Sequence, residues 1–226
     1  MRTEQTLPLV VAPAGALAAP STNRVLRNTY GLLSATLFFS AAVTAASAAL
    51  KLPHPGIVLT LLGFFGLLYA TTKLRNSVWG LAAVFGLTGF MGYTLGPIVS
   101  HYLSMPNGHQ VVMMALGGTA TIFVGLSAYA LSSRKDFSFM GGFLLAGIIV
   151  AFLVGLGAIF FQVPALSLTV SAVFVLLMGG LILFETSRIV HGGETNYIMA
   201  TVSLYVSIYN LFSSLLALIG FGGSDE

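Results

Sequence analysis

Charge is scarce along almost the whole of this chain. Between Asn28 and Gly223 only nine side chains are charged, and long apolar runs separate them. The nine are Lys51, Lys73, Arg75, Arg134, Lys135, Asp136, Glu185, Arg188 and Glu194. Charged residues make up 7% of the chain and the mean hydropathy is +0.97, whereas a soluble domain carries about 25% charged residues. Because so few charges cannot cover a water-exposed surface, the sequence predicts that a lipid bilayer surrounds the folded chain.

The apolar runs have the length of membrane-spanning helices. A helix needs about 20 mostly apolar residues to cross about 30 Å of hydrocarbon. Seven stretches qualify: residues 28–50, 55–72, 77–100, 111–131, 138–161, 165–187 and 197–221. A β-barrel would need alternating polarity, which these runs lack. The sequence therefore predicts an all-α integral membrane protein, a bundle of seven transmembrane helices.

The basic residues predict the orientation of the bundle. With the N-terminus in the cytoplasm, eight of the nine basic residues lie inside and only Lys51 lies outside. This asymmetry follows the positive-inside rule and places the C-terminus in the periplasm. We therefore expect a flexible cytoplasmic tail (1–26), a transmembrane domain (27–223) and a short periplasmic C-terminus (224–226). A secretory signal is the alternative for the tail, but three prolines interrupt its apolar stretch.

Composition argues against several classes of function. The chain has no cysteine, which removes disulfides, thiol nucleophiles and thiolate metal sites. The basic residues are scattered at the ends of apolar runs, so nucleic acid is not an expected partner. His101 and His109 lack a third ligand nearby, so we expect no metal site and no resident cofactor. Catalytic sets and phosphate-binding loops are missing, and an enzyme is not expected.

Small residues mark one face of the third expected span. Gly86, Gly89, Gly92 and Gly96 follow one another at spacings of three, three and four, which places them on one side of a helix. Small faces let helix backbones approach closely in lipid. We interpret this face as a helix-packing surface.

A polar stripe runs along the last expected span. Ser203, Ser207, Asn210 and Ser214 are spaced four, three and four apart in an otherwise apolar and aromatic helix. Such a stripe should avoid lipid and face the inside of the bundle. It serves either as a set of interhelical hydrogen bonds or as a polar pathway, and the sequence leaves both open.

Glu185 is the one carboxylate inside an expected span, about one turn from its cytoplasmic end. One interpretation is an ion pair with Arg188, three residues later. The other is an inward-facing carboxylate that binds a proton or a cation, since removal from water disfavours the charged form of a carboxylate. Glu185, Ser207, Asn210 and Arg188 are therefore the candidate proton- or cation-sensing residues.

Four segments carry a family resemblance. They are residues 23–30 (NRVLRNTY), 92–98 (GYTLGPI), 183–187 (LFETS) and the run 191–212, which contains HGGETNYI and SLYVSIYNLF. Together they resemble the Bax-inhibitor family (transmembrane Bax inhibitor motif), and most of all its proteobacterial YccA-like branch of inner-membrane modulators of the FtsH protease. The resemblance covers residues 23 to 221. It implies a multi-pass bacterial inner-membrane protein whose last helix is central, surrounded by the other six.

The resemblance implies two activities. The YccA-like branch implies a partner, a membrane-anchored AAA protease of the FtsH type that the protein binds and restrains. Other members behave as pH-sensitive calcium leaks, with a pair of aspartates in the last two helices as the sensor. Glu185 occupies the first of these positions, but Ser207 occupies the second and has no carboxylate. Since calcium prefers several charged oxygens, any interaction with Ca²⁺ is expected to be weak. The oligomeric state stays open.

Overall fold

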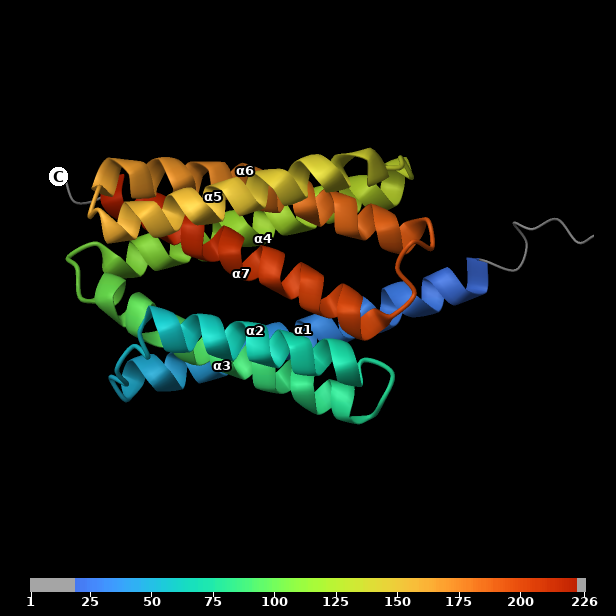
Figure 1. The fold of residues 1–226 in the computed structure, drawn as a ribbon, viewed down its shortest axis with the longest axis horizontal. Coiled ribbons are helices and arrows are strands. Elements are labelled where there is room, and N and C mark those ends of the chain that lie inside the picture. The colour runs from blue at the N-terminus through green and yellow to red at the C-terminus, as the bar shows by residue number, and fades with distance from the viewer. Residues whose placement is uncertain (1–18, 223–226) are drawn as a thin grey trace, which may run out of the picture.

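The computed structural model describes residues 19–222, and these residues form seven long α-helices and no strand. The helices are α1 (Ala19–Ala49), α2 (Ile57–Leu74), α3 (Trp79–Leu103), α4 (Gly108–Ser133), α5 (Gly141–Phe160), α6 (Pro164–Val190) and α7 (Tyr197–Gly222), with a 3₁₀ turn η1 (Ser138–Met140) before α5. All seven are long and apolar enough to span a membrane. The predicted all-α seven-helix fold is confirmed (Figure 1).

Most helix ends lie within three residues of the predicted spans, and the largest difference is at α1. This helix begins at Ala19, ahead of the predicted span that starts at residue 28, so residues 22–27, with Arg24 and Arg27 among them, are helical. Of the expected flexible tail of residues 1–26, residues 19–26 belong to α1, whereas residues 1–18 lie outside the described part of the chain and their flexibility stays a prediction. The expected periplasmic residues 224–226 lie outside it as well.

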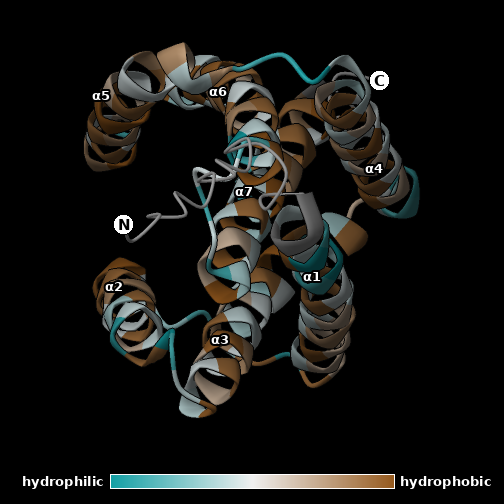
Figure 2. Ribbon diagram, turned by 90° about the vertical axis from the view of Figure 1, so that its right-hand side faces the viewer, coloured by the Kyte–Doolittle hydropathy of each residue, from teal (hydrophilic) through white to brown (hydrophobic). Residues whose placement is uncertain are grey.

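The last helix occupies the centre of the bundle (Figure 2). α7 packs against α1, α3, α4 and α6, while α2 packs on α3 and α5 packs on α6. In the most apolar stretch of each helix, 50% of the residues of α7 are buried but only 6% of those of α2. The periphery is strongly apolar: Phe38 and Phe160 are 80% and 82% exposed. Such an exposed apolar surface agrees with a bilayer as the solvent.

The glycine face of α3 lies against two different helices. A Cβ on Gly92 would be 2.6 Å from the carbonyl oxygen of Ser40, and a Cβ on Gly96 would overlap the Ser47 side chain. Gly89 faces Phe39 in the same way. These three positions therefore bring α3 close to α1, where the Thr44 hydroxyl donates to the Gly92 carbonyl at 3.0 Å. Gly86 faces α2 instead, 3.7 Å from Leu67.

The basic residues of the loops gather at one end of the bundle. The α2–α3, α4–α5 and α6–α7 loops lie at the end where α1 begins, and the first turns of α1 extend past the neighbouring helices (Figure 1). We call this the basic end; it carries Arg75, Arg134, Lys135 and Arg188. Lys51 lies at the opposite end, in the α1–α2 connection, which we call the far end.

Candidate functional site

Glu185 lies inside the bundle near the basic end. It belongs to the fully helical part of α6, and only 9% of it is exposed. The hydroxyl of Ser207 on α7 donates to its Oε2 at 3.3 Å, and Ser203 lies one turn before Ser207 on the same helix. Glu185, the one carboxylate within a predicted span, is therefore buried between the last two helices, and its Oε2 faces the Ser207 hydroxyl.

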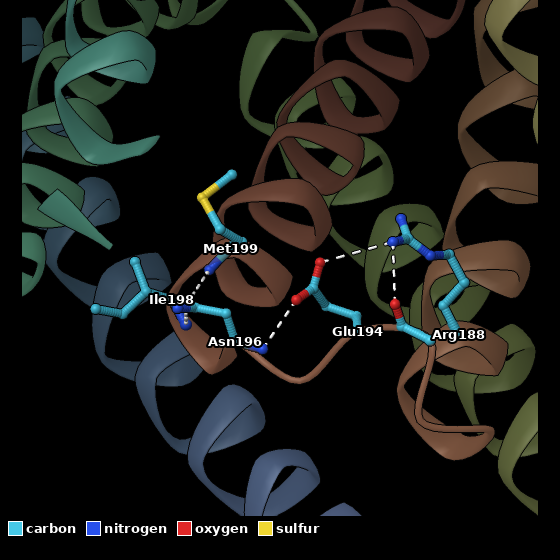
Figure 3. A network of polar contacts seen from close by, with 6 residues as sticks. Arg188, Glu194, Asn196, Ile198 and Met199 are labelled. Atoms are coloured by element: carbon cyan, nitrogen blue, oxygen red, sulfur yellow. Dashed lines mark hydrogen bonds and ion pairs between the residues drawn. The ribbon is translucent and has the colours of Figure 1, made fainter. Parts of the chain in front are cut away.

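Arg188 does not pair with Glu185, the partner that their spacing of three residues suggested. Its guanidinium contacts Oε2 of Glu194 at 3.7 Å and donates to the Gly193 carbonyl at 3.3 Å (Figure 3). It also lies over the Phe184 ring, 5.5 Å from its centroid. The α6–α7 loop turns back on α6 and presents Glu194 to this arginine, so the ion pair joins Arg188 to Glu194 and not to Glu185.

The polar stripe of α7 divides into parts with different contacts. Ser207 is fully buried and sits between Glu185 and the carbonyl of Ser203, which is 3.0 Å from its hydroxyl. Asn210 uses its amide within its own helix, where Nδ2 donates to the Val206 carbonyl at 2.8 Å. Ser214 is buried further towards the far end. The structure thus gathers Glu185, Ser203 and Ser207 and leaves Asn210 apart.

This arrangement allows two hydrogen-bonded forms of the Glu185 and Ser207 pair. The Ser207 hydroxyl has one proton, which it gives either to the Glu185 carboxylate or to the Ser203 carbonyl. When Glu185 carries a proton, it can donate to Ser207 while Ser207 donates to Ser203. The contact between Glu185 Oε2 and the Ser207 hydroxyl can therefore persist whether Glu185 holds or releases its proton.

Two tyrosines on α7 make buried contacts that the sequence analysis missed. The Tyr205 hydroxyl bonds to the Ser40 hydroxyl at 2.5 Å and donates to the Thr88 carbonyl at 3.2 Å. The Tyr209 hydroxyl bonds to the Thr94 hydroxyl at 3.1 Å. They lie one turn apart on the side of α7 that faces α1 and α3, and this spacing of four was the available signal. These bonds connect the central helix to both neighbours.

A large cavity lies away from Glu185. It has a volume of about 740 Å³ and lies between α1, α3, α4 and α7, with mostly apolar residues on its walls. Beyond Ser207 towards the far end, the bundle is filled by side chains such as Leu211, Phe212 and Leu216. No group of three or more histidines and carboxylates that could hold a metal ion occurs within the described residues.

Hydrogen bonds fasten the three loops of the basic end together. Nδ2 of Asn196 donates to the Arg75 carbonyl at 3.1 Å and to the Asn76 side chain at 2.9 Å, which joins the α6–α7 loop to the α2–α3 loop. Ser187 and His191 contact the α4–α5 loop. Asn196 also caps α7, since its Oδ1 accepts the amides of the second and third residues that follow (Figure 3).

Comparison with known proteins agrees with the sequence motifs. Residues 22–224 match the model of the family described as inhibitor of apoptosis-promoting Bax1. The chain belongs to this family. Among its relatives is the Escherichia coli protein named modulator of FtsH protease YccA, which is 57% identical over 205 residues, 91% of this chain and 93% of the relative.

Other relatives agree with a membrane protein. An uncharacterised protein of Pseudomonas aeruginosa is 56% identical over 202 residues, 89% of this chain and 91% of the relative. An uncharacterised membrane protein of Vibrio cholerae is 46% identical over 206 residues, 91% of this chain and 92% of the relative. A second Escherichia coli relative, 57% identical, is named inner membrane protein YccA. With its seven apolar helices, this family member is a multi-pass inner-membrane protein.

Proposed function

We propose that this protein binds and restrains a membrane-anchored AAA protease of the FtsH type. One observation carries the proposal: the relative named modulator of FtsH protease YccA is 57% identical and matches over nearly the full length of both chains. At this similarity the two proteins share the family fold. Neither the relative's name nor the family implies an enzyme, and we propose no catalytic activity.

The shape of the basic end supports this proposal. By the positive-inside rule this end faces the cytoplasm, so α1 begins on the cytoplasmic side and its first turns extend past the other helices (Figure 1). Eighteen residues precede the helix, and extended they would reach at most about 60 Å. A processive cytoplasmic protease can seize such a segment, and a bundle that resists extraction would then occupy the protease without being degraded.

Affinity purification from native membranes tests the proposal. A C-terminally tagged chain, expressed at its native level, should recover the FtsH-type protease, and its overproduction should slow turnover of other membrane substrates. Deletion of residues 2–20 separates two mechanisms. If co-purification and restraint are unchanged by this deletion, the tail is not the contact, and if the intact chain recovers no protease, the whole proposal fails.

A proton-gated leak of Ca²⁺ or another cation is the second candidate function, and the burial of Glu185 favours it. This carboxylate is enclosed between α6 and α7 with Ser207 as a donor, at the position where the resemblance implies half of an aspartate pair. One carboxylate and two hydroxyls fall short of the six to eight oxygens that Ca²⁺ prefers. Calcium would therefore be a weakly held, transported ion and not a resident cofactor.

Ion entry into liposomes that contain the pure protein tests the leak. We expect Glu185→Gln to abolish proton-dependent Ca²⁺ entry measured at about pH 6 and pH 8, because Gln cannot exchange a proton in this range. Ser207→Asp should increase entry, because it restores a second carboxylate beside Glu185. Glu194→Gln, in the α6–α7 loop, is the matched control. No flux at either pH in any variant would remove the leak from consideration.

A further inference from the structure

A groove that opens towards the bilayer runs between α1 and α4. These two helices lie on the same side of α7 and share the packing partners α3, α6 and α7, without packing closely on each other (Figure 2). The cavity of about 740 Å³ lies between them. Ala45 of α1 and Leu116 and Val124 of α4 belong to its wall and are nevertheless exposed. The cavity is therefore accessible from the side of the bundle, where the solvent is lipid.

The wall of this groove offers few free polar groups. Five of the six hydroxyl groups on it already have hydrogen-bond partners. Ser40 and Tyr205 bond to each other, and the Tyr209 hydroxyl bonds to a threonine of α3. Thr44 and Thr119 donate to backbone carbonyls. Because an apolar cavity stays dry and takes apolar ligands, the groove suits a hydrocarbon chain and not a polar solute.

The groove covers one half of the membrane. Its wall includes residues 37–49 of α1 and residues 112–124 of α4. At 1.5 Å per residue either stretch is about 18 Å long, close to the roughly 15 Å of hydrocarbon in one leaflet. Towards the basic end α1 and α4 meet, with the ring centroids of Tyr30 and Phe123 6.1 Å apart. A spanning helix of a partner would need a groove through both leaflets, whereas an acyl chain needs only this one.

Lys51 places a positive charge at the far end of the groove. Ala48 and Ala49 belong to the wall up to the last turn of α1, and the amide of Lys51 then donates to the Ala48 carbonyl at 3.1 Å. The Lys51 side chain is exposed, and lysines at helix ends extend to the membrane interface. The three carboxylates among residues 19–222 all lie towards the basic end. The open end of the groove therefore suits an anionic group.

We propose that this groove binds a phospholipid of the far-end leaflet, with an acyl chain in the cavity and the phosphate beside Lys51. The chain fills the space that α1 and α4 leave between them and packs against α7. By the positive-inside rule this leaflet is the periplasmic one. The lipid site is separate from Glu185 and from the basic end, so it depends on neither of the functions proposed above.

Native mass spectrometry of the full chain, titrated with phosphatidylglycerol in detergent, tests the acyl-chain site. We expect one lipid to bind more tightly than all others. Ala45→Phe should weaken this binding about tenfold, because its ring overpacks the groove. Ala46→Phe is the matched control, since Ala46 is exposed on the same helix but is not part of the wall. Equal binding by the two variants, or no tightly bound lipid in the original chain, would overturn the proposal.

A second comparison tests the headgroup. Lys51→Gln should weaken the binding of phosphatidylglycerol about fivefold, the effect expected of one basic residue near a membrane surface. It should leave the binding of diacylglycerol with the same chains unchanged. Lys73→Gln, at the basic end, makes the same change in charge and should affect neither lipid. If glycerol phosphate alone binds as tightly as the whole lipid, or if Lys51→Gln binds phosphatidylglycerol as tightly as the original chain, the assignment of a phospholipid to this groove is wrong.

Discussion

Gly92→Ala should weaken the contact between α1 and α3. The stability lost at this contact should exceed the stability that alanine adds to the helix. The added Cβ would lie 2.6 Å from the carbonyl oxygen and 3.2 Å from the Cα of Ser40. Both are backbone atoms, so no side-chain rotation can relieve the clash. The two helices must move apart, and the Thr44 bond to the Gly92 carbonyl lengthens with them.

The expected size follows from two opposing effects. Alanine favours a helix over glycine by about 1 kcal/mol, while overpacking of a close contact costs about 1–3 kcal/mol. Separation of the helices also weakens the hydrogen bond between Ser40 and Tyr205, a loss of about 0.5–1.5 kcal/mol. Gly86→Ala is the matched control on the same helix, because its Cβ would meet only Leu67 at an ordinary 3.7 Å. Since the helix gain is common to both variants, we expect Gly92→Ala to be about 1.5–4.5 kcal/mol less stable than this control.

Unfolding in mixed micelles, titrated with a denaturing detergent and followed by circular dichroism, measures this difference. Both variants carry the same chemical change in the same helix, so their difference in midpoint reports the contact with α1. Equal midpoints, or a more stable Gly92→Ala variant, would refute the argument that close backbone approach at this position holds α1 in the bundle.

Three further predictions concern polar groups outside that contact. Tyr205→Phe should lower the free energy of unfolding by about 1–3 kcal/mol in the same assay, because it leaves the Ser40 hydroxyl and a backbone carbonyl without their partner. Asn196→Ala should cost about 1 kcal/mol through loss of the α7 cap, in addition to the loss of its two bonds to the α2–α3 loop. Asn196→Asp should keep the cap but lose both loop bonds, and should therefore recover only part of the stability. Because its pKa is lowered in the fold, Asp136 stabilises the chain above its ordinary pKa and loses this effect as pH falls. Asp136→Asn should therefore reduce acid sensitivity in a pH series of thermal unfolding, with Ser138→Ala as a partial mimic.

The fold could be predicted from the sequence because membrane spans require long apolar runs and little else. The ends were less predictable, since hydropathy marks where lipid begins and not where a helix begins. Four of the six residues 22–27 are polar or charged, yet α1 continues through them. Similarly, spacing predicted the glycine face of α3, but only the packed bundle shows that Gly86 faces α2 while Gly92 faces α1.

The side-chain contacts of the site could not be predicted, because they depend on the path of the loops and on how the helices pack. Spacing within α6 made Arg188 a reasonable partner for Glu185, but the α6–α7 loop turns back and places Glu194 beside that arginine. Uniform spacing along α7 likewise suggested one polar stripe, although Asn210 bonds to its own helix while Ser207 reaches Glu185. Tyr205 was missed because an aromatic residue in an apolar helix carries no sign of where its hydroxyl lies.

The contact between α1 and α3 also connects the fold to the proposed restraint of a protease. A protease that pulls on the N-terminus meets α1 first, and the bonds from Ser40 to Tyr205 and from Thr44 to Gly92 oppose its removal. When degradation follows the population of the opened bundle, each 1.4 kcal/mol of lost stability raises its rate about tenfold. Gly92→Ala should therefore be degraded by the purified FtsH-type protease faster than Gly86→Ala, and should restrain it less. If the two variants differ in stability but are degraded at the same rate, resistance to extraction is not the source of the restraint.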